Sequence, residues 1–284
     1  MSQPDTARIA ALAARHPGLV VEAAAVVWRR RAMWLGLLAA FLAACLYLDL
    51  SLGRLWAGLG DLGVMAGLMW PPTSGGFLVD YLKAIGETLA MAFLGTLLAS
   101  LLSIPLGFLG ARNVVPNFAI HFGLRRVLDV VRGVDVLIWA LIFVSVVGLG
   151  PFAGILAIAL NDTGVLAKMY AEAIEGADKR PGEGVTAAGG GAADVARLAI
   201  WPQVLPVFLS NSLYFFEANT RSATILGVVG AGGIGFFLAD RIRLNAWSDV
   251  AFIILLILPT VAFIDFLSRQ LRLRALGRDE AGPR

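Results

Sequence analysis

AIGETLAMAFLGTLLASLLSIPLGFL, residues 84–109, is a long apolar run with a single charged side chain, Glu87. A helix needs about 20 largely apolar residues to cross a bilayer, and this run is long enough. Similar runs occur along the rest of the chain, at 33–50, 127–147, 152–166, 205–229 and 250–267. The sequence therefore predicts an all-α polytopic membrane protein with about six transmembrane helices.

The composition agrees with this fold class. Apolar residues make up 58% of the chain, charged residues only 15%, and the mean hydropathy is +0.80. A soluble domain is typically about 45–50% apolar and about 25% charged, so lipid is the expected surrounding. The lone Cys45 excludes an intrachain disulfide, and no metal site is expected from only two histidines. Nucleic acid is not expected as a partner, because the arginines flank apolar runs and form no single stripe.

The lysines and arginines predict the orientation. Of the 23, only Arg54, Lys83, Arg241 and Arg243 fall on one side of the predicted spans, and Arg221 lies within a span. All the others fall on the side of the two termini. Cytoplasmic loops carry the excess of basic residues, so both termini are predicted to be cytoplasmic. The chain then divides into a cytoplasmic segment 1–32, a transmembrane domain 33–272 and a cytoplasmic tail 273–284.

Two segments keep alternative interpretations. Residues 6–28 are expected to form an interfacial amphipathic helix or, alternatively, a tail without a specific role. Residues 51–80 are apolar, broken by glycines and closed by Pro71-Pro72. This second segment lies along the outer membrane surface or forms a packed external helix.

A glycine-rich run, ILGVVGAGGIGFF, spells the G-x-G-x-x-G fingerprint of dinucleotide-binding folds at Gly230, Gly232 and Gly235. That fingerprint needs a strand before it and a helix after it, whereas here it follows a predicted span. We therefore expect no cofactor. Glycine tolerates positive φ and close backbone approach, so the run is expected to unwind the helix at its extracellular end and to line a pore with backbone.

Charged residues inside a predicted span are costly and usually face a bundle interior or a wet path. Glu217 and Arg221 are four residues apart, so they share a helix face and can pair. Either Arg221 faces a passing anion, oriented by Glu217 and accompanied by Asn219, or the two form a packing salt bridge, which we favour. Other acidic residues lie near predicted span ends and are expected in solvated headgroup positions, namely Glu87, Asp135 and Asp162.

The connection between the fourth and fifth spans contains EGVTAAGGGAADVARLAIWP, with Glu183, Gly189 and Pro202 at positions one, seven and twenty. This spacing resembles the EAA loop of ABC importer permeases, E-A-A-x-x-x-G followed by I-x-L-P. Gly184 and Val185 replace the two alanines, while Ala199 and Trp201 replace the isoleucine and leucine. Three consecutive glycines suit a break between two short helices better than a helix interior.

The resemblance extends from Glu87 to Arg269 and includes WPQVLPVFLSNSLYFFEANTRSATILGVVGAGGIG, residues 201–235. This part is similar to the permease subunit of phosphonate ABC importers, with the type I importer permease fold. The resemblance implies separate ATPase subunits that use ATP and Mg²⁺, a second permease copy as a homodimer, and a periplasmic or lipoprotein phosphonate-binding protein. It also implies the bacterial inner membrane. The sequence itself contains no G-x-x-x-x-G-K-[ST] phosphate loop.

The resemblance also suggests which residues carry the function. The loop 171–202 would dock on the ATPase, chiefly through Glu183 and Gly189, with further candidates in Glu172, Glu175, Arg197 and Pro202. The translocation path for a phosphonate or phosphate anion would be lined by Glu217, Asn219, Arg221, Gly230, Gly232 and Gly233. A fixed cation and free backbone N–H groups would make the low-dielectric path tolerable for an anion.

Three rival functions remain to be compared with this one. The first is an ABC permease for another solute, such as methionine or phosphate itself. The second is an ion-coupled secondary transporter, which should show inverted repeats and midplane carboxylates; the sequence shows neither. The third is an intramembrane enzyme, for which no set of nucleophile, base or metal ligands is found. No catalytic residue is therefore predicted.

Overall fold

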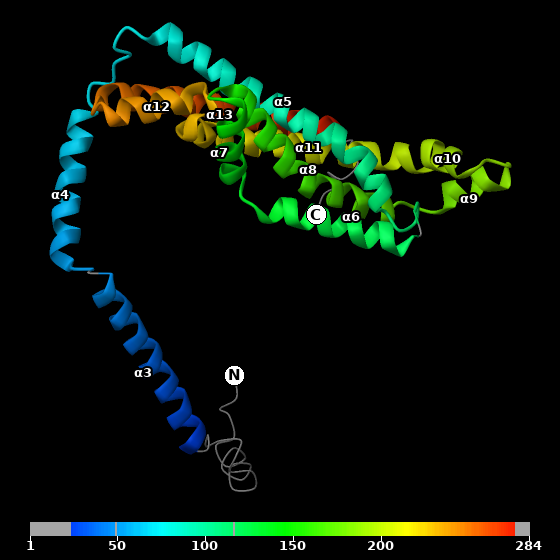
Figure 1. Cartoon of the computed structure of the whole chain (residues 1–284), viewed down its shortest axis with the longest axis horizontal. Coiled ribbons are helices and arrows are strands. Elements are labelled where there is room, and N and C mark those ends of the chain that lie inside the picture. Colours follow the sequence, from blue (N-terminus) through cyan, green and yellow to red (C-terminus); the bar gives the residue numbers. More distant parts are fainter. Residues whose placement is uncertain (1–23, 49, 116, 276–284) are drawn as a thin grey trace, which may run out of the picture. The chain divides into compact units, whose positions relative to one another are not determined.

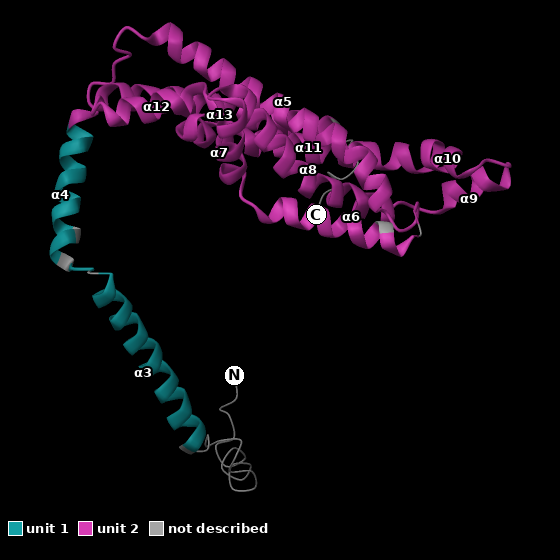
Figure 2. Ribbon diagram, in the orientation of Figure 1, with its two compact units in different colours: residues 1–67 teal, residues 68–284 magenta. Residues whose placement is uncertain are grey.

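The computed structural model describes residues 24–48, 50–115 and 117–275 (Figure 1). All regular elements in these ranges are helices. The chain divides into two compact units, residues 1–67 and 68–284 (Figure 2). The predicted interfacial helix at 6–28 and the predicted tail at 273–284 lie largely outside the described residues.

The first unit contains α3 (Ala24–Tyr47) and α4 (Leu52–Leu68). α3 is long and apolar enough to cross a membrane, and its apolar side chains are exposed. α4 falls in the segment 51–80, and the Ser51 hydroxyl accepts a hydrogen bond from the Arg54 amide at its start. This segment therefore contains a regular helix, although its place relative to the membrane stays a prediction.

The second unit is built on four long helices, which are labelled in Figure 1. They are α5 (Leu78–Gly110), α8 (Pro151–Glu175), α11 (Trp201–Leu226) and α13 (Trp247–Ala275). α11 belongs to one helical stretch of 40 residues, Ala192–Ala231, that passes the span criteria as a whole. Among the described residues five helices are long and apolar enough to cross a membrane, or up to six if one bent pair counts as a span.

Among the described helices, α5 and α8 make the most extensive pair. Glycines on α5 allow the close approach: a Cβ at Gly95 would lie 2.7 Å from the Ile158 Cβ, and one at Gly107 would lie 2.8 Å from the Tyr170 Cβ. Such small residues are what lets helices pack in lipid, where van der Waals contact drives association. This pair forms the centre of the unit, and α11 packs against both members.

The predicted span 127–147 is wrong as a single helix. The chain forms α6 (Phe118–Gly133) and α7 (Val136–Val147), which meet at a bend of 84°. Asp135 causes the restart, because its carboxylate accepts a hydrogen bond of 2.8 Å from the Leu137 amide and caps α7. Asp135 is thus a helix cap.

The predicted span 152–166 is too short. α8 continues to Glu175, because the polar residues that interrupt its apolar run are satisfied inside the protein. Asp162 is only 3% exposed and lies within the helix, so its predicted headgroup position is wrong. A buried carboxylate is found where hydrogen-bond partners are supplied, and here they come from other parts of the chain.

Candidate functional site

The connection between α8 and α11 folds as a helical hairpin, here called the α9–η1 hairpin. α9 (Arg180–Ala187) leads into a glycine turn, and α10 (Ala192–Asp194) and η1 (Val195–Ile200) run directly into α11. The predicted glycine break is confirmed, but only the helix before it is short, because the helix after it belongs to one stretch of 40 residues, Ala192–Ala231. Gly189 has φ +87°, which L side chains rarely adopt, and the Asp194 carboxylate accepts a hydrogen bond of 2.9 Å from the Gly191 amide.

The base of the hairpin is fixed to the first turn of α11. The Asp178 amide donates to the Gln203 Oε1 at 2.9 Å, and the Gln203 Nε2 donates back to the Asp178 carbonyl at 3.2 Å. Both ends of the hairpin are therefore attached to α11.

An open groove of ≈ 660 Å³ lies between the two arms of the hairpin. Glu183 and Lys179 line it on one side, and Val195 and Ile200 on the other. A second hollow, of ≈ 480 Å³, is lined by Arg197 together with Phe108 and Trp201. The hairpin thus presents charged edges beside an apolar floor, which is a surface suited to contact with another protein.

The predicted docking residues are not equivalent. Glu172, Glu183, Gly189, Arg197 and Pro202 are all exposed. Glu175 differs, because its Oε1 accepts a hydrogen bond of 2.9 Å from the Arg112 amide and an ion pair of 3.3 Å from Arg125. Since its carboxylate is already bound within the chain, Glu175 anchors the end of α8, and its role in docking stays a prediction.

Arg221 and Glu217 belong to a four-residue ionic network that joins α11 to α13. The Arg221 Nη1 lies 3.0 Å from both carboxylate oxygens of Asp265, whereas its distance to Glu217 is 3.7 Å. Glu217 instead accepts a hydrogen bond of 2.6 Å from Arg272. The sequence correctly paired Arg221 with Glu217 but missed the two stronger contacts. This geometry supports the packing interpretation.

We expect Arg221→Gln to lower the amount of folded protein and the uptake activity in equal proportion. The substitution leaves Asp265 without its cation, and polar contacts between membrane helices are worth about 0.6–2 kcal/mol, enough to change abundance several-fold. Adding Asp265→Asn should restore part of the loss, since both groups are then neutral. Fluorescence-detected size exclusion and uptake, measured on the same membranes, check this. Uptake falling far more than folded protein would instead place Arg221 on the path.

Asn219 does not share a face with Arg221. Its side chain is 6% exposed and donates hydrogen bonds to Thr96 on α5, at 2.8 Å, and to the Asp162 carboxylate on α8. Asn161 also donates to Asp162, at 3.1 Å. Asn219 therefore holds three helices together inside the subunit, which corrects its predicted place in the lining of a path.

This buried polar cluster was missed at the level of the sequence. Thr96 lies in an apolar run, and Asp162 was assigned to a span end. The signal available was the polar triplet Asn161-Asp162-Thr163 between two apolar stretches. A second polar contact lies on the same three helices, where the Ser212 hydroxyl bonds to Ser100 at 2.9 Å and to Tyr170 at 2.8 Å.

The glycine run does interrupt the helix, as predicted. η2 (Gly227–Ala231) widens the end of α11, and Gly230, Gly232 and Gly233 have φ of +102°, +80° and +69° before α12 (Gly233–Arg243) begins. The break is held from outside its own helix, because the Gly150 amide donates to the Gly230 carbonyl at 3.1 Å.

The expected free amides are not available at the start of α12. The Gly233 amide donates to the Glu87 carboxylate at 3.3 Å, and the Ile234 amide donates to the Thr88 hydroxyl at 2.9 Å. These residues of α5 cap α12, so this part of the predicted path is corrected: its backbone is engaged in packing. Among the described residues no cluster of histidine, cysteine or acidic side chains could hold a metal ion.

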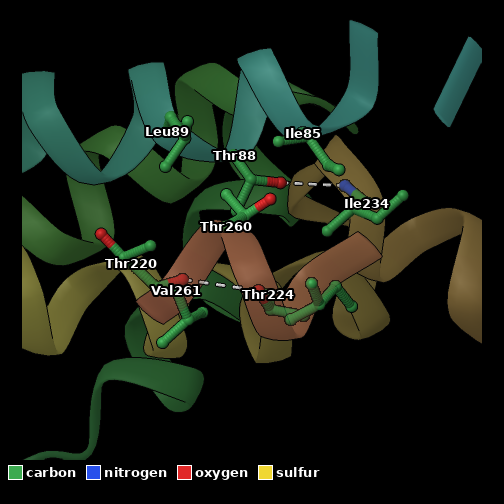
Figure 3. Close-up of a pocket in the computed structure, with 9 residues that line it drawn as sticks. Ile85, Thr88, Leu89, Thr220, Thr224, Ile234, Thr260 and Val261 are labelled. Atoms are coloured by element: carbon green, nitrogen blue, oxygen red, sulfur yellow. Dashed lines mark hydrogen bonds between the residues drawn. The ribbon is translucent and has the colours of Figure 1, made fainter. Parts of the chain in front are cut away.

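A small cavity beside this cap is lined by threonines of three helices (Figure 3). Thr88 of α5, Thr220 and Thr224 of α11 and Thr260 of α13 surround a space of only ≈ 10 Å³. A cavity needs about 10–15 Å³ to hold one water molecule, so this one is too small for a transported solute. It is a packing defect between spans.

Comparison with known proteins defines the class. The chain belongs to the family of binding-protein-dependent transport system inner membrane components, whose family model matches residues 103–276. It is therefore a multi-pass permease subunit of an ABC importer. Membership of this family implies an ATPase and a binding protein as partners.

The more particular similarity is to permeases for phosphorus oxyanions. The chain is 38% identical to the phosphite transport system permease protein PtxC of Stutzerimonas stutzeri over 247 residues, 86% of this chain and 89% of that protein. It is 41% identical to the phosphate-import permease protein PhnE of Mycolicibacterium smegmatis over 72% of this chain, which is 39% of that longer protein.

Solved structures show the same fold at lower identity. The structure "Inward facing conformations of the MetNI methionine ABC transporter" matches with a TM-score of 0.63 at 20% identity, covering 72% of this chain and 99% of that chain. This similarity confirms the predicted type I importer permease fold.

Proposed function

We propose that this chain is the membrane-spanning subunit through which a small phosphorus oxyanion, phosphite, phosphonate or phosphate, enters the bacterial cell. The main support for this proposal is the 38% identity to a phosphite permease over 86% of the chain. The similarity to the methionine transporter, at 20% identity, supports the fold alone.

The exposed α9–η1 hairpin supports the view that this subunit is driven by a separate ATPase. Its open groove, with Glu183 at the edge and Gly189 at the tip, is the proposed EAA-type docking surface, and Glu172, Arg197 and Pro202 flank it. ATP and Mg²⁺ would be bound by the ATPase, and closure of two ATPases would move the hairpins and rock the spans.

The proposal also includes the orientation of the chain in the membrane and its pairing with a second copy. The excess of lysine and arginine on the hairpin side supports cytoplasmic termini, with the glycine break and α12 facing the periplasm. One such chain supplies half a pathway, so a second copy of it completes the transporter as a homodimer. A periplasmic or lipid-anchored binding protein would deliver the anion to that outer face.

The test is reconstitution of the full chain with its ATPase and binding protein in liposomes. We expect accumulation of labelled phosphite or methylphosphonate only with internal ATP and Mg²⁺, and no accumulation of methionine. Uptake driven by an ion gradient without nucleotide would refute the proposal, and ATP-driven uptake of methionine instead would assign a different solute.

A further inference from the structure

A groove of ≈ 420 Å³ opens beside the glycine break, at the end of the unit opposite the α9–η1 hairpin. Its lining comes from the α7–α8 elbow, from η2 and from α12. The floor is apolar, with Leu141, Leu149, Val228 and Phe236, and among the described residues the charged groups that line it are Asp240 and Arg243 on α12. Its volume is within the range of small-molecule sites, about 300–1,000 Å³.

The floor of this groove is tied to the helix break. A Cβ at Gly230 would lie 2.5 Å from the Leu149 Cδ2, so the elbow presses directly on the glycine backbone. The Gly150 amide holds the same point through its 3.1 Å hydrogen bond to the Gly230 carbonyl. Any opening of the elbow therefore changes the groove and the end of α11 together.

Arg243 is the available cation that lines this groove. Arg241 is engaged, since its Nε lies 3.1 Å from the Tyr81 hydroxyl and 3.6 Å from Asp249, and its guanidinium covers Phe77 at 4.4 Å. Lys83 is exposed but lines none of the grooves described above. Within the described part of the chain, Arg243 is exposed, lines the groove and forms no ion pair.

The other positive groups expected near the path already have partners within the chain. Arg221 is bound to Asp265, and the amides at the start of α12 are bound to Glu87 and Thr88. An anion that enters this groove thus meets the guanidinium of Arg243, for which the described residues supply no ion pair, next to an apolar floor where electrostatic attraction is less screened than in water.

We propose that this groove is the outer mouth of the translocation path, and that Arg243 receives the phosphorus oxyanion as it leaves the binding protein. This inference rests on the proposed function and on the predicted orientation of the chain in the membrane. Asp240, which lines the same groove, keeps the attraction weak. A conducting site must bind well enough to admit its solute and weakly enough to release it.

The experiment uses the reconstituted transporter and two measurements on each variant: ATP hydrolysis stimulated by phosphite-loaded binding protein, and phosphite transported per ATP. Arg243→Gln is expected to keep the stimulated hydrolysis within about twofold while transport per ATP falls about five- to tenfold. Arg243→Lys should retain more transport, and Asp240→Asn should not lower it. Lys83→Gln is the matched control, an exposed cation at the same end but outside the groove.

The outcomes separate this inference from the proposed function. Equal behaviour of Arg243→Gln and Lys83→Gln overturns the assignment of Arg243. If stimulated hydrolysis falls as much as transport, the groove is a contact for the binding protein, and the anion site is refuted. If the unmodified transporter carries no phosphorus oxyanion with ATP, the proposed function itself fails, whatever the variants do.

Discussion

Gly189→Val is expected to reduce uptake about tenfold or more while leaving membrane insertion intact. Gly189 has φ +87°, and a β-branched residue in that conformation costs about 1–3 kcal/mol. No atom lies within 4 Å of a Cβ at this position, so the backbone conformation alone is responsible. The strained turn would open and displace α9 from η1, and the docking surface would be lost.

Gly189→Asn is the matched control for this change. Asparagine adopts a positive φ several-fold more often than other residues with a side chain, and a Cβ at this position meets nothing within 4 Å. This variant should therefore keep the turn, dock and transport normally. Co-purification of the ATPase with a tagged chain, measured beside uptake, gives the answer. Normal coupling in Gly189→Val would remove the hairpin from the mechanism.

The second large effect is expected at Asp162, in the stability of the subunit. Asp162→Leu removes the acceptor used by Asn219, and a buried donor left without a partner costs about 1–3 kcal/mol. At about 2–4 °C per kcal/mol, the melting midpoint in detergent should fall by several degrees. Asp162→Asn keeps an acceptor oxygen and should lose less.

A double-mutant cycle separates the hydrogen bond from the space that Asp162 fills. Replacing both partners by apolar groups can be nearly neutral, so Asp162→Leu combined with Asn219→Leu should recover part of the lost stability. Thr96 stays satisfied in that variant, because its hydroxyl donates to the Ala92 carbonyl at 2.8 Å. A midpoint for Asp162→Leu equal to that of the unmodified protein would show that the cluster contributes nothing.

The long apolar helices could be predicted because their signal is local. Residues 84–109 contain one charge, and the observed α5 (Leu78–Gly110) extends that run mainly at its N-terminal end. The wrong predictions concern positions where residues distant in the sequence decide the local structure. α8 continues through Asn161 and Asp162 because Asn219, more than fifty residues away, satisfies the carboxylate. No periodicity in the sequence reports such a contact.

The candidate path was partly mispredicted for a reason that the sequence does contain. Residues two apart on an α-helix are separated by about 200° around its axis, so Asn219 and Arg221 could not both face one path. The partner of Arg221, Asp265, lies on a helix that the sequence does not place next to α11. Gly230 and Gly232 were expected at a break, and the break is there; the capping of α12 by Glu87 needed the tertiary fold.

The helical stretch that begins at Ala192 continues without a break as far as Val229, where the positive φ of Gly230 interrupts it. At 1.5 Å per residue this gives about 57 Å, nearly twice the thickness of the hydrocarbon core. Rotation of this helix by 10° about one end would displace the opposite end by about 10 Å, without breaking a backbone hydrogen bond within the helix. Since Gln203 and Asp178 attach the hairpin to this helix, we expect a push near Gly189 that rotates the helix about a point near Gln203 to move its far end, before Gly230, by a larger distance.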